Sequence, residues 1–247
     1  MNLDVPMCGF DSETTGVDVY DVENTKIVSF AMILQESENS EPKIREWLMN
    51  PGIEIPTGAS DVHGITTEYA VEHGRDYVTC LQEIADAFTY TIINGIVLTA
   101  YNGSFDITLI RNQFEHHGIR FDPGLWGKFY MVDPLVMDKS LNRFRKGKRT
   151  LSVVASLNGY SLEDAHEATA DVLATIHVAR KILPAYVAKI EQSGLEVTDF
   201  GTVMAVQCLD YKNSALSLEQ YFRKKENDPT IVINKSWPFQ DREHHLG

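Results

Sequence analysis

Apolar positions along the chain follow two different periods, which predict where strands and helices lie. Three runs rich in β-branched residues come first and are separated by polar turns, as in consecutive strands joined by hairpins. We expect these strands at residues 5–11, 26–35 and 43–49. A Pro- and Gly-rich stretch, residues 51–64, follows them and predicts a loop.

The rest of the chain alternates between helical and strand patterns. In residues 76–93 apolar side chains recur at helical spacing and the pattern stops at an Asn-Gly pair, which predicts an amphipathic helix. By the same criteria we expect strands at 96–101 and 129–133 and helices at 105–116, 150–157 and 167–183. Pro184 then marks a kink or the start of a new helix. Residues 197–225 predict one or two further helices, and the tail after Asn227 is weakly patterned.

Three hairpin-linked strands followed by strands that alternate with helices predict an α/β fold. The sheet is expected to be mixed and to be covered by helices on both faces. With 247 residues, of which 43% are hydrophobic, the chain is long enough for one large domain with a full core. In such a sheet, groups with a chemical function gather at strand ends and in the first turns of the helices that follow.

The cysteines and the N-terminus bear on the compartment. Cys8, Cys80 and Cys208 lie far apart and form no C-x-x-C motif, which suits a reducing cytoplasm better than a disulfide framework. The N-terminus M-N-L-D-V-P-M-C-G-F lacks the features of an export signal, and no window approaches the roughly 18 to 20 apolar residues of a membrane span. We therefore expect a cytoplasmic protein that is neither exported nor anchored in a membrane.

Charge narrows the classes of partner. A formal net charge of -13 argues against a general nucleic-acid coat protein, because a lasting grip on phosphate normally requires a basic surface. It does not exclude an enzyme whose acids hold a divalent metal, because the metal restores the local attraction for phosphate. Residues 142–150, N-R-F-R-K-G-K-R-T, run against the overall sign. They are either a solvated loop or an edge that guides phosphates.

The stretch G-F-D-S-E-T-T-G, residues 9–16, places Asp11 and Glu13 two positions apart at the end of the first expected strand. Side chains alternate along a strand, so both carboxylates project from the same face. Two neighbouring negative charges repel each other unless a cation or a shared proton relieves them. Alone, such a pair is usually a solvated strand end.

Two further acids lie where strands are followed by helices. Asp106 falls in the first turn of the helix expected at 105–116, and Asp171 lies near the start of the helix expected at 167–183. An acid at either place is also what the helix dipole favours. His166 lies five residues before Asp171, where a capping or surface histidine is the ordinary alternative.

The four acids and the histidine together predict metal-dependent phosphodiester hydrolysis. Two divalent ions held by carboxylates clamp a scissile phosphate, one activating water and the other stabilising the leaving oxygen. Carboxylate oxygens suit Mg²⁺ or Mn²⁺, so two such ions are the expected cofactors. A histidine titrates near neutral pH, which suits it to take the proton of the attacking water.

In order and spacing these motifs resemble those of the DEDDh family of 3′-to-5′ exonucleases, in particular the epsilon-type proofreading subunits of bacterial replicative DNA polymerases. The three motifs read F-D-S-E-T-T-G at residues 10–16, N-G-S-F-D at 102–106 and H-E-A-T-A-D at 166–171. V-H-G-I-T at 62–66 is similar to a segment of epsilon-type members and favours DNA. The resemblance covers residues 5–182 and implies a ribonuclease H-like three-layer fold, with a five-stranded sheet whose second strand is antiparallel to the rest.

For the metal ions, the resemblance implies roles for all four acids. Asp11, Glu13 and Asp171 would hold the first ion. Asp11 would bridge to the second ion, which Asp106 would support through water. These four acids are also the expected catalytic residues, together with His166 as general base.

For the substrate, the resemblance implies a set of contacts around the 3′ end. A second branch of the family carries tyrosine four residues before the last acid, where this chain has Glu167. The histidine five residues before that acid, His166, matches the other branch, so the resemblance assigns the chain to the histidine branch. Asp133, in F-Y-M-V-D-P, matches an acid of relatives and is expected to give structural support. Residues implied to hold the terminal nucleotide are Thr14, Thr15, His63, Asn102 and Phe105, of which Phe105 is alternatively a core residue.

Three functions are compatible with these observations. The favoured one is a 3′-to-5′ exonuclease that hydrolyses DNA to nucleoside 5′-monophosphates, in proofreading or DNA repair. Its partners would be single-stranded DNA or the 3′ ends of duplex DNA, and a DNA polymerase subunit. The same chemistry on RNA ends or short oligoribonucleotides is the first alternative. An inactive nucleic-acid-binding adaptor is the second, and the complete set of acids argues against it.

The C-terminal part extends beyond the motifs. We expect a catalytic domain at residues 1–190 and a helical extension at 191–247, which is similar to tails of exonuclease-like proteins from actinobacteria and their phages. The extension either packs on the catalytic domain, which we favour, or docks a polymerase or clamp partner. The residues expected to make these contacts are Leu209, Leu216, Leu218, Tyr221 and Phe222, whereas His244 and His245 are expected to bind nothing.

Overall fold

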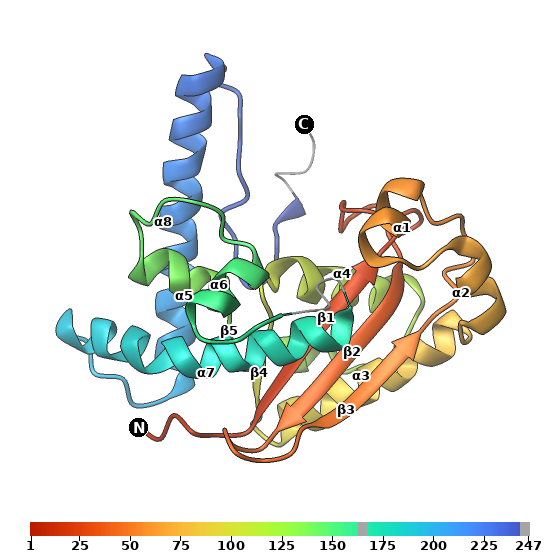
Figure 1. Cartoon of the computed structure of the whole chain (residues 1–247), viewed down its shortest axis with the longest axis horizontal. Helices are drawn as coiled ribbons and strands as arrows, with labels where there is room; N and C mark the ends of the chain where they lie inside the picture. Colours follow the sequence, from red (N-terminus) through yellow and green to blue (C-terminus); the bar gives the residue numbers. More distant parts are fainter. Residues whose placement is uncertain (163–166, 243–247) are drawn as a thin grey trace.

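A mixed sheet of five strands, in the order β3-β2-β1-β4-β5, forms the centre of the computed structural model (Figure 1). The structure describes residues 1–162 and 167–242. The strands are β1 (Met7–Thr14), β2 (Ile27–Gln35), β3 (Lys43–Leu48), β4 (Val97–Thr99) and β5 (Met131–Val132). β2 runs antiparallel to both of its neighbours, whereas β1 pairs with β4, and β4 with β5, in parallel. The predicted mixed sheet with an antiparallel second strand is confirmed.

Helices cover both faces of this sheet. α3 (Tyr77–Ile93) and α4 (Ser104–His116) pack on one face, and the long α7 (Ala168–Gln192) packs on the other. The remaining helices are α1 (Thr57–His63), α2 (Thr67–His73), the 3-10 helix η1 (Pro123–Gly127), α5 (Pro134–Leu141), α6 (Leu151–Leu157) and α8 (Phe200–Glu226). Within the described ranges, no helix combines the length and the apolar character that a membrane crossing requires.

The side chains of β1 alternate between the two faces of the sheet, which decides where its acids point. Phe10 belongs to the core under α3 and α4, whereas Gly9 faces α7. A Cβ atom at Gly9 would lie 2.6 Å from Cγ1 of Val172, so the missing side chain lets α7 approach the sheet closely. The next residues on the α7 face are therefore Asp11 and Glu13.

α7 is one continuous helix through Pro184, so the predicted new start at this residue is wrong. Proline removes one backbone hydrogen bond from a helix. Buried side chains on both sides of it, Leu183 and Tyr186, hold the helix against the core nonetheless. The residues that recur at helical spacing on its inner face are all buried, namely Ala168, Val172, Thr175, Ile176, Ala179 and Leu183.

Two short helices occupy part of the stretch predicted as a loop and the chain that follows it. α1 ends the stretch 51–64, and α2 comes directly after it. α1 has no buried residue and α2 buries only Ala70, so neither carries the apolar stripe that identifies a helix in a sequence. α5 is likewise absent from the prediction; the side chain of Asp133 caps it by accepting the N–H of Leu135.

Among the described residues that follow α7, the C-terminal part forms one long helix, α8, which begins against α5 and β5 and extends away from the sheet (Figure 1). Val203 and Gln207 are fully buried, and the side-chain oxygen of Gln207 accepts the N–H of Asp133 at 2.8 Å. Of the residues expected to carry the packing, Leu209, Leu218 and Tyr221 are exposed. The buried stripe differs from the expected one because the second half of α8 passes beyond the sheet and its covering helices.

The tail after α8 returns to the side of the sheet that α3 and α4 cover. Trp237 is buried, and the ring of Phe239 contacts that of Trp126 edge-on with centroids 5.6 Å apart. The hydroxyl of Tyr20 donates to the carbonyl oxygen of Gln240 at 2.5 Å. Two aromatic residues therefore anchor a segment whose weakly patterned sequence predicts little structure.

Candidate active site

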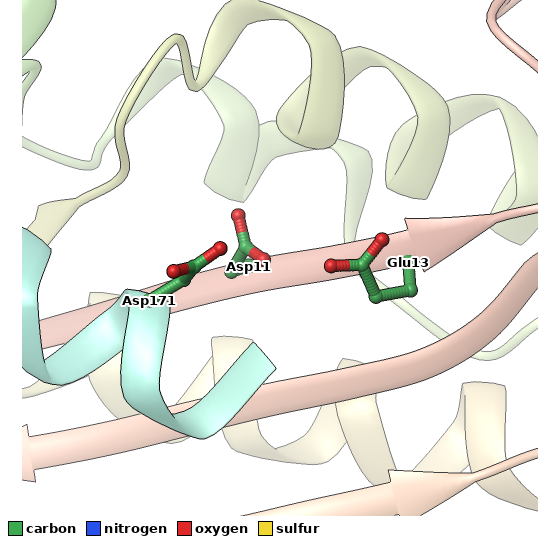
Figure 2. Close-up of side chains that lie close together, drawn as sticks. All are labelled: Asp11, Glu13 and Asp171. Carbon is green, nitrogen blue, oxygen red and sulfur yellow. The ribbon is translucent and has the colours of Figure 1, made fainter. Parts of the chain in front are cut away.

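Three carboxylates from two elements converge at one end of the sheet. Asp11 and Glu13 come from β1, and Asp171 comes from the first turn of α7 (Figure 2). One oxygen of each carboxylate lies within 4.8 Å of one oxygen of the other two. The structure therefore brings together three of the four acids that the motifs predict as metal ligands.

The local structure explains why these acids meet. On β2, the residues opposite Asp11 and Glu13 are Ala31 and Ser29, whose small side chains leave this face of the sheet open. α7 begins only a few residues before Asp171, so this acid lies in the first turn, where a helix favours negative charge.

Asp106, the fourth acid, approaches β1 from the first turn of α4. It is 4% exposed, and its Oδ1 accepts the N–H of Ser12 at 3.1 Å and the hydroxyl of Ser12 at 2.5 Å. β4 pairs with β1 only as far as Gly9, so no β4 residue competes for the Ser12 N–H. Ser12 is absent from the predicted site. Because it lies between Asp11 and Glu13 on β1, its side chain points to the other face of the sheet, toward α4 and Asp106.

Burial and nearby negative charges raise the pKa of Asp11, Glu13 and Asp106. Burial raises the pKa of Asp11 well above its usual range, and the charges of the other three carboxylates raise it further. Burial and the charges of Asp171 and Asp106 raise the pKa of Glu13 to about 8. Burial raises the pKa of Asp106 to about 7, although the hydrogen bonds from Ser12 act in the opposite direction. Within the described part of the chain, no cation offsets these shifts.

This donor set fits divalent metal ions. Carboxylate oxygens are the ligands that Mg²⁺ and Mn²⁺ prefer. A bound cation would also relieve the repulsion that raises the pKa values of Asp11 and Glu13. The cluster of Asp11, Glu13 and Asp171 is therefore a candidate metal site.

A cavity of about 350 Å³ opens beside the cluster, with Glu13, His63, Tyr69 and Glu167 in its wall. Nδ1 of His63 accepts the N–H of Ile65 at 3.1 Å, so the proton of the neutral ring is on Nε2. This Nε2 is buried and makes no hydrogen bond of standard geometry to the described residues, although the ring interacts with the backbone of Thr14. Burial lowers the pKa of His63, so the ring is neutral at neutral pH and offers an N–H donor.

Thr14 and Thr15, predicted to contact the terminal nucleotide, differ in exposure. Thr14 is half-buried, and its hydroxyl donates to the carbonyl of Gly16 at 2.7 Å. Thr15 is 4% exposed; its hydroxyl donates to the carbonyl of Asn24 at 2.6 Å and accepts the N–H of Lys26 at 2.8 Å. Its own N–H donates to the carbonyl of Lys26 at 2.9 Å. Both donors of Thr15 are thus used to hold the connection between β1 and β2.

Asn102 and Phe105 flank the start of α4. Asn102 is exposed and has a φ of 60°, in the left-handed region that asparagine tolerates. The carboxylate of Asp133 accepts the N–H groups of Asn102 and Gly103, both at 3.1 Å, and so fixes the turn that leads to Asp106. Burial raises the pKa of Asp133 to about 6. Phe105 packs against the core under α3 and α4. This position agrees with the second of its two expected roles, that of a core residue.

His166, the predicted general base, lies outside the described residues, as do His244 and His245. The first described residue after His166 is Glu167, which precedes α7 and lines the same cavity as Glu13.

The basic segment 142–150 is held to the protein by Asp138. Arg145 contacts the carboxylate of Asp138 at 2.8 Å, and Arg149 contacts the same oxygen. Arg143 and Lys146 remain exposed. The segment is therefore more than a solvated loop, because two of its cations neutralise a buried acid.

Comparisons with known proteins identify the family of the chain. A family model described as Exonuclease matches residues 8–179, which contain all four acids. A curated protein of Rhodobacter capsulatus, described as a DNA polymerase III subunit epsilon-like protein, is 27% identical over 198 residues. These residues cover 79% of this chain and 25% of that protein, so the chain spans about a quarter of the relative's length.

Solved structures with a similar fold include exonuclease I of E. coli in a zinc-bound complex with single-stranded DNA. The TM-score is 0.61 at 23% identity, and the match covers 76% of this chain and 43% of that one. Exonuclease I from Methylocaldum szegediense matches with a TM-score of 0.58 at 21% identity, again over 76% of this chain and 43% of that one. The chain spans less than half of these structures, and the likeness shows a common fold.

Proposed function

The chain belongs to the exonuclease family, and we propose that it is a metal-dependent 3′-to-5′ exonuclease that hydrolyses DNA to nucleoside 5′-monophosphates. The observation that carries the proposal is the convergence of Asp11, Glu13 and Asp171 within 4.8 Å. Asp106 joins them through its hydrogen bonds to Ser12. Buried carboxylates this close are unfavourable unless a cation offsets their charge, so their presence supports a metal-binding function.

The roles of the acids follow from the resemblance and the site geometry. Asp11, Glu13 and Asp171 would hold one Mg²⁺ or Mn²⁺ ion, and Asp106 would support a second. When bound, the ions supply charge stabilisation at the phosphate and lower the pKa of a water molecule. The chain contributes rigid positions for the ligands, since β1 and the first turns of α4 and α7 carry all four acids.

Two histidines have distinct proposed roles. His166, five residues before Asp171, would accept the proton of the attacking water. His63 would orient the substrate, because its neutral ring presents a buried N–H in the cavity beside Glu13. The cavity volume of about 350 Å³ lies at the lower end of the range of small-molecule sites, about 300 to 1,000 Å³, and suits a single terminal nucleotide.

DNA is the proposed substrate on two grounds. V-H-G-I-T at residues 62–66 resembles a segment of epsilon-type enzymes, and a relative is described as epsilon-like. A solved structure with the same fold is described as a complex with single-stranded DNA. A role in proofreading or repair and a polymerase subunit as partner are proposed on the same grounds. The complete acid cluster counts against the inactive adaptor.

A nuclease assay tests the proposal. The protein is incubated with 5′-labelled single-stranded DNA in Mg²⁺, in Mn²⁺ and in EDTA, beside Asp11→Asn and His166→Ala variants. We expect the wild-type protein to produce a ladder of products that shortens from the 3′ end, and only when Mg²⁺ or Mn²⁺ is present. The Asp11→Asn and His166→Ala variants should not produce it. Asp86→Asn serves as the matched control, because this acid lies on the exposed side of α3.

Other outcomes separate the alternatives. Cleavage in EDTA, internal cuts or full activity of Asp11→Asn would contradict the proposal. An RNA strand of the same sequence that is degraded faster than the DNA would move the assignment to an exoribonuclease. A protein that binds both strands and cleaves neither would be the adaptor.

A further inference from the structure

A cleft rich in cations lies between α5, the segment 142–150 and α8. Its volume is about 430 Å³. Lys139, Arg143 and Arg149 line one side, and Leu218 and Tyr221 of α8 line the other. We call this region the basic cleft. The chain as a whole has a formal net charge of -13, so this group of cations differs in sign from the overall charge of the protein.

Only some of these cations are available to a ligand. Arg149 binds Asp138, as described above. Within the described residues, the salt bridges do not include Lys139 or Arg143. Lys139 is partly buried, and burial lowers its pKa, so an anionic ligand would favour its charged form. Lys139 and Arg143 are therefore the candidate phosphate contacts.

Two exposed aromatic rings accompany the cations. Tyr221 lines the basic cleft and is 58% exposed, whereas Phe144 is not in its wall but directly follows the lining residue Arg143 and is 90% exposed. The guanidinium of Arg143 lies 5.7 Å from the centroid of the Phe144 ring. Single-stranded nucleic acids bind to this combination, because bases stack on aromatic rings while cations hold the phosphates.

The basic cleft is connected with the start of α4. A smaller cavity of about 80 Å³ shares Lys139 and Leu218 with the basic cleft and extends to Asn102. The hydroxyl of Tyr101 donates to the carbonyl of Arg149 at 2.7 Å, which ties the segment 142–150 to the residue before Asn102. The cleft is thus linked to the turn that leads to the acidic site.

We propose that the basic cleft binds single-stranded DNA upstream of the 3′ end that enters the acidic site. Lys139 and Arg143 contact phosphates, and Phe144 and Tyr221 stack against bases. The identity of the ligand rests on the proposed function. Tyr221 and the rest of α8 lie outside residues 8–179, so one wall of this cleft is an addition to the part of the chain that the family model describes. An acidic protein segment would be attracted by the same cations but has no bases to stack on the rings.

Fluorescence anisotropy in EDTA tests the proposal with a 5′-labelled oligothymidylate of about 20 nucleotides, longer than the 4 to 16 nucleotides of typical single-strand sites. Without metal there is no cleavage, and the acidic site repels DNA. Phe144→Ala is expected to weaken binding about tenfold, because this factor lies within the range that one stacked base contributes. Lys139→Gln/Arg143→Gln is expected to reduce the slope of log affinity against log salt by about 1.4, since each phosphate contact contributes about 0.7.

Matched controls are available elsewhere on the surface. Lys181→Gln removes an exposed cation from α7, and Tyr90→Ala removes an exposed ring from α3. Both controls should bind like the wild type. In Mg²⁺, Phe144→Ala should raise KM for the long oligonucleotide about tenfold without changing kcat, because the expected loss is one stacking contact.

Several results would overturn the proposal. The proposal fails if Phe144→Ala binds the oligonucleotide as tightly as the wild type does, or if the wild type shows no detectable binding. It also fails if Lys139→Gln/Arg143→Gln leaves the slope of log affinity against log salt unchanged. Competition by polyglutamate as effective as that by unlabelled oligonucleotide would assign the cleft to an acidic protein partner instead. Binding in EDTA that depends on Phe144, in a protein without nuclease activity, would contradict the proposed function and leave the basic cleft as a DNA site.

Discussion

Two clusters of buried charge in this protein differ in how their charge is neutralised. The side chain of Asp138 is buried, and two guanidinium groups, those of Arg145 and Arg149, contact it. Asp11 is surrounded by the carboxylates of Glu13, Asp106 and Asp171, whose charges raise its pKa. In both clusters burial disfavours the charged carboxylate. Only Asp138 finds compensating cations within the described part of the chain.

The difference separates a structural charge from a functional one. An acid with internal partners contributes to folding, and removing one member leaves the others unpaired. A group of acids whose charges repel one another destabilises the fold and persists where an external ligand uses it. The Asp138 cluster therefore holds the segment 142–150 in place, and the Asp11 cluster is the candidate metal site.

The largest predicted effect is the loss of activity in Asp11→Asn. Metal ions contribute several kcal/mol to catalysis, and each 1.36 kcal/mol is a factor of ten in rate, so we expect a loss of about 10³-fold. In EDTA the same variant should unfold at an equal or higher temperature than the wild type, because it removes one repelling charge. Nuclease rates and thermal unfolding measure the two effects. A variant that is inactive because it is less stable would contradict the comparison.

Asp138→Asn is predicted to show the opposite pattern. Breaking a buried ion pair on one side costs about 3 to 5 kcal/mol, so the free energy of unfolding should fall by about that amount. The two arginines left without their partner are the physical reason. Urea unfolding measures the loss, and nuclease activity at a low, permissive temperature should be retained at the acidic site. Unchanged stability would show that solvent already screens this cluster.

The acidic site was predictable from the sequence because its geometry is local. Period two places Asp11 and Glu13 on one face of β1, and helix starts place Asp106 and Asp171 beside the sheet. Ser12 was not predictable, because its hydrogen bonds depend on where the pairing with β4 ends.

The periphery was less predictable for related reasons. α1 and α2 bury almost nothing, so no apolar stripe marks them. In the basic segment the sequence shows the cations but hides that Arg145 and Arg149 meet Asp138, an acid of the preceding helix. Leu209 and Tyr221 are exposed because of the direction in which α8 leaves the sheet. The hydrophobic pattern within one helix does not determine that direction.

Metal should stabilise the acidic cluster and leave the other cluster unaffected. A ligand at 100 times its Kd contributes about 2.7 kcal/mol, and 1 kcal/mol shifts Tm by about 2 to 4 °C in a chain of this size. We therefore expect Mg²⁺ to raise Tm of the wild type by about 5 to 10 °C over its value in EDTA. Asp11→Asn should abolish this rise and Asp138→Asn should keep it. An equal rise in all three proteins would place the metal elsewhere.

Without metal, stability should fall as pH rises. The pKa of Glu13 is about 8 in the folded protein against an ordinary value of 4.5, so the folded state keeps a proton that the unfolded state releases. The stabilisation is complete below the unfolded pKa and is lost as pH rises through the folded pKa. Urea unfolding in EDTA at pH values between these two limits measures the decline. Glu13→Gln should flatten it, and stability that increases over this window would contradict the assignment.

The smallest predicted effect concerns Ser12, which links the acids of β1 to Asp106. Ser12→Ala removes the hydroxyl that bonds to Oδ1 of Asp106 but leaves the backbone N–H bond in place. Losing an outer hydrogen-bond partner of a metal ligand typically reduces affinity or activity by about 10- to 100-fold, and the remaining bond places the expected loss near tenfold. Ser12→Thr keeps the hydroxyl and should restore most of the activity, and Ser193→Ala, at the other end of α7, is the matched control. If the hydroxyl orients Asp106 toward metal, a higher Mg²⁺ concentration should recover part of the activity of Ser12→Ala. A loss of activity that does not depend on Mg²⁺ would instead mean that the Ser12 hydroxyl only stabilises the fold.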